Sequence, residues 1–212
     1  MGMSDYGYKE ITQCRSCGGT ELEMVLSLGP TSVINFGDKK PLDAPLDLVL
    51  CHKCSLLQLK HTVDPEYLFR EYYYKSGVNE SMKDSLRDIV KKIEQRSELV
   101  DGDRVIDIGA NDGTLLGAYT YKVEKVAFEP AANLHAELKS KADDVIEDFF
   151  SAEKMMGLKA KVITAISMFY DLDDPNTFLE DVKKILTDDG LLVIQQNYVG
   201  SMLENNAFDN IV

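Results

Sequence analysis

Val105-Ile106-Asp107-Ile108-Gly109-Ala110-Asn111-Asp112-Gly113 is the stretch that decides the fold of this chain. Its first half is an apolar run rich in β-branched residues, which is typical of a buried strand, and it leads into a glycine turn. Helix-compatible residues follow, so we expect a helix over 112–121. A strand, a glycine turn and a helix open many nucleotide-binding α/β domains. Gly109 lets a ligand approach the backbone closely, and Asn111 is a residue type that tolerates positive φ.

The same turn favours S-adenosylmethionine (SAM) over a dinucleotide. The dinucleotide pattern G-x-G-x-x-G fails because Asn111 and Thr114 replace its second and third glycines. The carboxylates of Asp107 and Asp112 would repel a pyrophosphate, whereas they suit the ammonium and sulfonium groups of SAM. Twenty positions after Gly109 stands Glu129, at the end of an expected strand over 123–128, where it can accept hydrogen bonds from ribose hydroxyls. The alternative is a strand and turn that bind no ligand.

Further cofactor candidates lie at the ends of other expected elements. An acid and an aromatic residue, Asp148 and Phe149, follow a short strand over 144–147, where an adenine can hydrogen-bond and stack. Core packing is the alternative for Phe149 and for its neighbour Phe150. The predicted cofactor-binding set is Ser76, Gly77, Asp107, Gly109, Asn111, Asp112, Gly113, Glu129, Pro130, Asp148, Phe149 and Met168.

The segments after the glycine turn alternate regularly between strand and helix patterns. We expect helices over 131–140, 151–157 and 175–186, with strands over 162–169 and 191–195. Five strand–helix units of this kind predict a parallel, doubly wound sheet of the Rossmann-like class. The sequence therefore divides into an N-terminal domain over 1–66, a tyrosine-rich linker and helix over 67–100, and a SAM-binding domain over 101–212.

All four cysteines lie near the start of the chain, as two C-x-x-C pairs: Cys14 with Cys17, and Cys51 with Cys54. Each pair can present two thiolates to one tetrahedral ion, so the pattern indicates a structural zinc site with four sulfur ligands. Two disulfides or a redox pair are the alternatives, and reducing conditions disfavour both. A module this small needs the metal for much of its stability.

Composition limits the partners and the location. A formal charge of −13 over 212 residues disfavours binding to the phosphates of a nucleic acid. No run approaches the roughly 18 apolar residues that span a membrane, and the first residues lack a secretion signal. We therefore expect a cytoplasmic protein with a small-molecule substrate.

A tyrosine cluster precedes the first long helix pattern, which carries an apolar face from Met82 to Ile93. The cluster is Tyr67-Leu68-Phe69-Arg70-Glu71-Tyr72-Tyr73-Tyr74-Lys75-Ser76-Gly77. Its functional interpretation is a lid over the cofactor, with phenol groups available for substrate hydrogen bonds or proton transfer. The alternative is an amphipathic aromatic patch that joins two domains. Tyr170 and Asp171, at the end of the fourth expected strand, border the same expected pocket. Tyr74, Tyr170 and Asp171 are the catalytic candidates.

Six motifs together resemble those of the sugar C-methyltransferases, which use SAM to methylate nucleotide-activated keto-deoxysugars. The matching stretches are C-R-S-C-G at 14–18, P-L-D-L-V-L-C-H-K-C at 45–54, Y-K-S-G at 74–77, D-I-G-A-N-D-G at 107–113, F-Y-D-L-D-D-P at 169–175 and M-L-E-N-N-A-F-D-N-I at 202–211. The resemblance spans the whole chain. It implies a zinc domain followed by a class I methyltransferase domain, with a nucleotide sugar as substrate.

The resemblance also implies features that this chain does not show. Relatives continue with a His-Glu-His-rich segment, which holds their base, and a further domain, and many carry histidine where this chain has Tyr170. Their sheets usually have seven strands, against five expected here. We therefore expect a sheet that is incomplete at its C-terminal end, completed by a missing domain or a partner chain, and weak or absent methyl transfer. The alternatives are a non-catalytic SAM-binding module or a methyltransferase for another small molecule.

Overall fold

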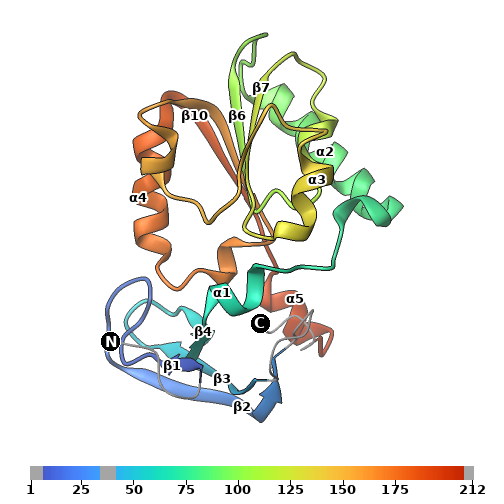
Figure 1. Ribbon diagram of the computed structural model, residues 1–212. Coiled ribbons are helices and arrows are strands. Elements are labelled where there is room, and N and C mark those ends of the chain that lie inside the picture. The colour runs from blue at the N-terminus through green and yellow to red at the C-terminus, as the bar shows by residue number, and fades with distance from the viewer. Residues whose placement is uncertain (1–6, 34–41, 208–212) are drawn as a thin grey trace. The chain divides into compact units, whose positions relative to one another are not determined.

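The computed structural model describes residues 7–33 and 42–207, and the chain forms two compact units (Figure 1). One unit consists of Met1–Arg70, Asp171–Asn176 and the stretch that begins at Tyr198. The other consists of Glu71–Tyr170 and Thr177–Asn197. The end of the sixth matching motif, residues 208–211, lies outside the described residues. Among the described helices, none has the length and apolar character needed to cross a bilayer.

The second unit is built on a parallel sheet of five strands in the order β10-β9-β6-β7-β8. Their bounds are β6 Arg104–Ile108, β7 Glu124–Phe128, β8 Asp144–Ile146, β9 Ala160–Ile166 and β10 Leu186–Gln195. The order reverses between β6 and β9, the first and fourth strands of this sheet along the chain. Ligands of doubly wound sheets bind at the carboxyl ends of the strands beside such a reversal.

Helices lie on both faces of this sheet (Figure 1). Helix α2, Glu80–Arg96, buries Leu86, Val90 and Ile93 in one cluster with Val105 of β6 and other strand residues. On the opposite face, Phe128 of β7 contacts Phe150, which contacts Phe178 of α4, Pro175–Ile185. The predicted doubly wound Rossmann-like sheet is therefore confirmed, and the half-buried Phe150 packs between the sheet and α4.

The helix predicted over 112–121 is wrong. Turns and one 3-10 helix, η2 Leu116–Ala118, occupy that stretch. The Asp112 carboxylate accepts hydrogen bonds from the main chain and hydroxyl of Thr114, which competes with helical pairing. Gly113, at φ +75°, and Gly117 are poor helix formers. The helix predicted over 131–140 is also shorter, as η3 Ala132–Leu134 and α3 His135–Leu138, and 151–157 holds only the 3-10 helix η4 Ala152–Met155.

The first unit contains two small antiparallel sheets, β2-β3-β4 and β1-β5. The strands are β1 Tyr8–Glu10, β2 Leu22–Ser32, β3 Asp43–Cys51, β4 Leu57–Leu59 and β5 His61–Val63, and the helices are α1 Pro65–Phe69 and α5 Val199–Glu204. The 3-10 helix η1, Ser76–Val78, belongs to the second unit, and η5, Phe169–Asp171, spans the boundary between the two units in the sequence. Cys51 ends β3, so the sheet fixes one of the two C-x-x-C turns.

Candidate functional site

The four cysteine sulfur atoms of the first unit form one cluster. All of them lie within 4.8 Å of one another, and no disulfide joins them. The Sγ–Sγ distance is 3.6 Å from Cys14 to Cys54 and also from Cys17 to Cys51. Zinc bonds to sulfur of about 2.3 Å in a tetrahedron place neighbouring sulfurs about 3.8 Å apart, so the cluster fits a Zn²⁺ ion with four thiolate ligands. The predicted zinc site is confirmed.

The two cysteine turns share one backbone design. The residue after each pair, Gly18 or Ser55, has positive φ, and its N–H donates to the carbonyl of the first cysteine of its pair. Gln58 supports the site from β4, because its Nε2 donates to Cys14 Sγ at 3.2 Å. Outer partners of this kind orient metal ligands.

A later segment of the chain, residues 171–176, belongs to the same unit and is bound to the first cysteine turn. Arg15, between the paired cysteines, lies 3.4 Å from the Asp173 carboxylate, which also forms an ion pair with Lys9. The Asn176 side chain donates to the Ser16 carbonyl at 2.7 Å. Burial alone would raise the pKa of Asp173, but its hydrogen bonds to Lys9 and Thr62 hold that pKa below its ordinary value. The metal turn and the segment after η5 are therefore held together.

The glycine turn lies at the carboxyl end of β6 in the second unit. Gly109, at φ +72°, has no side chain, and a Cβ there would lie 3.4 Å from the Cβ and Cγ of Met168, which follows β9. The two predicted cofactor residues therefore meet beside the reversal in strand order. Asn111 adopts the positive φ, +52°, that the sequence predicted it would tolerate.

Glu129 follows β7 and is 5% exposed. Its two carboxylate oxygens accept N–H groups of Asn111, at 2.7 Å, and of Ala131, at 2.8 Å. Burial raises the pKa of Glu129, although these two N–H groups oppose the shift. Each oxygen retains a lone pair for a ribose hydroxyl. Glu129 and the glycine turn are thus one hydrogen-bonded assembly, and Pro130 is half-buried beside it.

Asp107 is a second buried carboxylate, inside β6. Its Oδ1 accepts the hydroxyl of Thr164 in β9, the residue paired with it across the parallel strands. Burial raises the pKa of Asp107 to about 7, and the negative charge of Glu129 adds to the shift. Two buried acids that repel each other favour a cationic ligand, which would neutralise them. These two carboxylates fit the ammonium and sulfonium of SAM, and their negative charge would repel a pyrophosphate.

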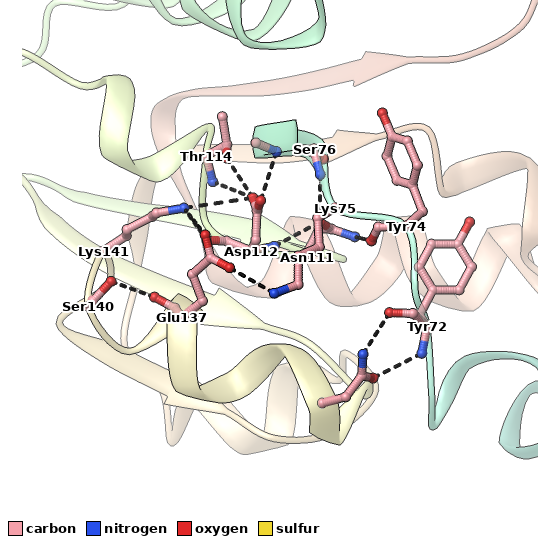
Figure 2. A network of polar contacts seen from close by, with 12 residues as sticks. Tyr72, Tyr74, Lys75, Ser76, Asn111, Asp112, Thr114, Glu137, Ser140 and Lys141 are labelled. Carbon is pink, nitrogen blue, oxygen red and sulfur yellow. Dashed lines mark hydrogen bonds and ion pairs between the residues drawn. The ribbon is translucent and has the colours of Figure 1, made fainter. Parts of the chain in front are cut away.

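The main-chain N–H groups of Ser76 and Gly77 donate hydrogen bonds to side chains of the glycine turn, and Figure 2 shows this network. Asp112 is 1% exposed, and its Oδ2 accepts the Gly77 N–H at 2.7 Å. The Ser76 N–H donates to the Asn111 side chain at 3.0 Å. Gly113, at φ +75°, has no room for a Cβ, which would come within 2.9 Å of a Leu138 methyl. Direct cofactor contact of these residues stays a prediction.

Most of the remaining candidates follow β8 or β9, whereas Tyr74 lies in the segment before η1. Asp148 accepts the Phe149 N–H and an ammonium proton of Lys154. Tyr170 is 38% exposed within η5, and Tyr74 is 45% exposed. Burial raises the pKa of Asp171, at the end of η5, to about 7. The catalytic roles of Tyr74, Tyr170 and Asp171 stay predictions.

Sequence reasoning missed several supporting residues. Thr164 had a signal, because it is a hydroxyl in an otherwise apolar strand. Asn133 bonds both the N–H and the carbonyl of Tyr72, and Lys141 donates to the Asp112 carbonyl. Both lie in a segment that reads as an ordinary surface helix, and only the tertiary structure shows what they contact.

Comparison with known protein families identifies the class. A family model described as a methyltransferase domain matches residues 77–210, and one described as a zinc-binding domain matches residues 14–69. The chain belongs to the SAM-dependent methyltransferase family, with a zinc-binding domain ahead of the methyltransferase domain. The predicted family and both predicted cofactors, SAM and zinc, are thereby confirmed.

Among individual proteins, the chain is similar to the C-methyltransferase NovU of Streptomyces niveus. The two are 30% identical over 216 residues, which cover 96% of this chain and 51% of the relative. The chain thus spans about half the length of this relative.

Two solved structures also match. The plantazolicin methyltransferase BamL, in complex with a triazolic desmethylPZN analog and SAH, matches with a TM-score of 0.49 at 19% identity, covering 62% of this chain and 53% of that one. The cyclopropane synthase MmaA2 from Mycobacterium tuberculosis matches with a TM-score of 0.47 at 19% identity, covering 68% and 54%.

Proposed function

We propose that this chain binds SAM at the carboxyl ends of β6 and β7 and takes part in C-methylation of a small acceptor. The observation that carries the cofactor site is the buried Glu129 carboxylate, held by the Asn111 N–H of the glycine turn at 2.7 Å. We assign Glu129 to the ribose and the negative field of Asp107 to the cationic end of SAM. Gly109 and Met168 would flank the cofactor. Asp148 and Phe149 are assigned to the adenine.

C-methylation is proposed from the similarity to the C-methyltransferase NovU and from the motifs that resemble sugar C-methyltransferases. The acceptor we propose is a nucleotide-activated keto-deoxysugar. When bound, SAM supplies an electrophilic methyl group on a sulfonium centre. The chain must supply a base for the proton next to the acceptor ketone and a donor for the enolate oxygen that forms when the electron pair of the C–H bond shifts.

Asp171 is better matched to the base role than either tyrosine. A phenol titrates near pH 10 when unperturbed, whereas burial raises the pKa of Asp171 to about 7, close to physiological pH. We therefore assign proton removal to the Asp171 carboxylate. The phenols of Tyr74 and Tyr170 are assigned as hydrogen-bond donors to the acceptor, because both are accessible.

The test has two stages. Calorimetry first measures binding of SAM and of S-adenosylhomocysteine (SAH), the product that remains after methyl transfer. Mass spectrometry then detects methylation of a panel of nucleotide keto-sugars and of simple ketones. We expect SAM binding at about micromolar concentration. We expect methyl transfer to be weak, with a nucleotide keto-sugar preferred over the simple ketones. Binding of SAM with transfer to no acceptor on the panel would contradict the catalytic part of the proposal.

Three variants then test the roles: Asp171→Asn, Tyr74→Phe and Tyr170→Phe. Loss of a general base typically costs about 10²–10⁴-fold in rate, and loss of one donor costs less. Tyr121→Phe is the matched control, because this tyrosine has a similar exposure, 40%, and precedes β7 at the amino ends of the strands. An Asp171→Asn variant as active as the control would remove Asp171 from the base role.

A further inference from the structure

The segment 72–77, here called the strap, is held by side chains of the methyltransferase unit (Figure 2). Five of its main-chain groups have side-chain partners: Tyr72 N–H and carbonyl on Asn133, Tyr74 carbonyl and Ser76 N–H on Asn111, and Gly77 N–H on Asp112. The main-chain N–H and carbonyl groups of a segment are usually paired within secondary structure, for example with a neighbouring strand. Here three side chains are the partners, and each comes from a segment that follows β6 or β7.

Asn111 has two functions at one position. Its backbone has the positive φ, +52°, that the turn requires, and its N–H binds Glu129. Its side chain makes three further hydrogen bonds, from Ser76 N–H and Asp112 N–H to Oδ1 and from Nδ2 to the Tyr74 carbonyl. A glycine would satisfy the backbone conformation but none of the side-chain bonds. The strap therefore explains why an asparagine, and no second glycine, stands in this turn.

Charged groups connect the same two segments. The ammonium of Lys75, in the strap, lies 3.0 Å from Glu137 of α3, and Glu137 also pairs with Lys141 at 3.1 Å. Lys141 in turn donates to the Asp112 carbonyl at 2.7 Å. Hydrogen bonds from Lys75 and Lys141 lower the pKa of Glu137, which keeps it ionised near neutral pH. The strap is thus attached to the glycine turn directly and also through α3.

We propose that Asn111 and Asn133 are positioning residues that attach the strap to the cofactor turn, so that cofactor binding and ordering of the strap are coupled. This inference rests on the proposed function, because it takes the glycine turn as the SAM site. A ligand that fixes the turn fixes the Asn111 side chain, and with it the main chain at Tyr74 and Ser76. The ring of Tyr74, which is 45% exposed, points away from this network (Figure 2), where it can reach an acceptor. Cofactor would then bind first and acceptor second.

Hydrogen exchange measured by mass spectrometry tests the coupling in the full chain. Peptides covering 71–79 and 105–115 are followed with and without SAH. We expect SAH to slow exchange in both peptides of the parent protein. In Asn111→Gly the turn keeps its conformation, but the 71–79 peptide should exchange about tenfold or more faster in the presence of SAH, as expected for the loss of one or two hydrogen bonds.

Asn133→Ala is the second variant, because Asn133 is exposed in η3 and its replacement leaves the glycine turn intact. It should accelerate exchange near Tyr72 and leave the 105–115 peptide protected by SAH. Asn133→Asp should restore part of the protection, since it retains an acceptor for the Tyr72 N–H. Asn205→Ala is the matched control, an exposed amide that bonds only its own helix among the described contacts.

The outcomes separate this inference from the proposed function. No binding of SAH to the parent protein would overturn both. Protection of the 105–115 peptide by SAH, with strap exchange in both variants equal to that of the Asn205→Ala control, would overturn the coupling alone. A purely structural role is also distinguishable, because it would accelerate strap exchange equally with and without SAH.

Discussion

At the scale of single residues, Glu129 connects the cofactor turn to the end of the next strand. Its oxygens accept two main-chain N–H groups within a 5%-exposed site, so the carboxylate is fixed before any ligand arrives. A fixed acceptor loses little entropy on binding a ribose hydroxyl, which makes its contribution to affinity larger than that of a mobile side chain.

Glu129→Ala should weaken SAM binding by about ten- to a hundredfold, the range for loss of one charge-assisted hydrogen bond. Calorimetric titration measures the change. Glu153→Ala, which removes an exposed carboxylate from η4, is the control for the change in net charge. Equal affinities of the two variants would place the ribose elsewhere.

Asp107 predicts a pH dependence of cofactor binding. Its pKa is raised to about 7, so it is mostly protonated at pH 6 in the free protein. A cationic ligand favours the ionised form, so SAM affinity should rise as pH increases from 5.5 to 7, by at most about tenfold per pH unit. The ammonium of SAM stays protonated in this window. Calorimetry should show the dependence in the parent protein and a flat profile in Asp107→Asn.

The same shift has a consequence for stability. In the unfolded chain Asp107 ionises near pH 4, whereas in the folded chain it ionises near pH 7. The unfolded state therefore binds fewer protons between these values, so this group lowers the free energy of unfolding as pH rises from about 4 to 7. Asp107→Asn should remove that part of the pH dependence in urea unfolding without ligand.

At the scale of elements, the sequence predicted the strands better than the helices. Strands β6, β7 and β9 contain buried apolar runs, and β6 and β7 are followed by a glycine turn and an acid, respectively. Such patterns depend on the sequence within and next to the strand itself. The helix predicted over 112–121 failed because the side-chain bonds of Asp112 and the positive φ of Gly113 outweighed an apolar pattern. Tertiary contacts of this kind leave no mark on hydrophobic periodicity.

The candidate site divides in the same way. The cysteine pairs, Gly109 and Glu129 were predictable because their spacing alone indicates a chemistry. Thr164, Asn133 and Asp173 act through partners that are distant in the sequence. Their residue types are ordinary for a strand, a surface turn and a loop, so only the folded structure reveals them.

Asp173 gives a test at the level of the loop between η5 and α4. Asp173→Ala removes the ion partner of Arg15, whose side chain is 12% exposed, and of Lys9. Leaving a largely buried guanidinium without its carboxylate should lower the free energy of unfolding by about 1–3 kcal/mol. Urea unfolding with zinc present measures this. Glu21→Ala, at an exposed carboxylate of the same unit, should change stability by less than about 0.5 kcal/mol. An equal loss in both variants would exclude the loop contact as the cause.

At the scale of the whole molecule, the two units depend on different ligands. Zinc belongs to the first unit and SAM is assigned to the second, so each should stabilise one unfolding transition. In differential scanning calorimetry, chelation of the metal should lower or abolish one transition. SAH at about 100 times its Kd should raise the midpoint temperature of the other transition, because it adds about 2.7 kcal/mol to the free energy of unfolding of that unit. A single transition that responds equally to the chelator and to SAH would show that the two units unfold together.

The discontinuity of the first unit also sets an order of events during synthesis. The four cysteines leave the ribosome early, whereas Asp173 follows its partner Thr62 by 111 residues. At about 5–20 residues per second, that interval lasts roughly 6–22 s. The nascent chain therefore has time to bind zinc before Asp173, which forms ion pairs with Arg15 and Lys9, has been synthesised. The N-terminal unit can load its metal during translation, yet it completes its fold only when most of the methyltransferase unit has been made.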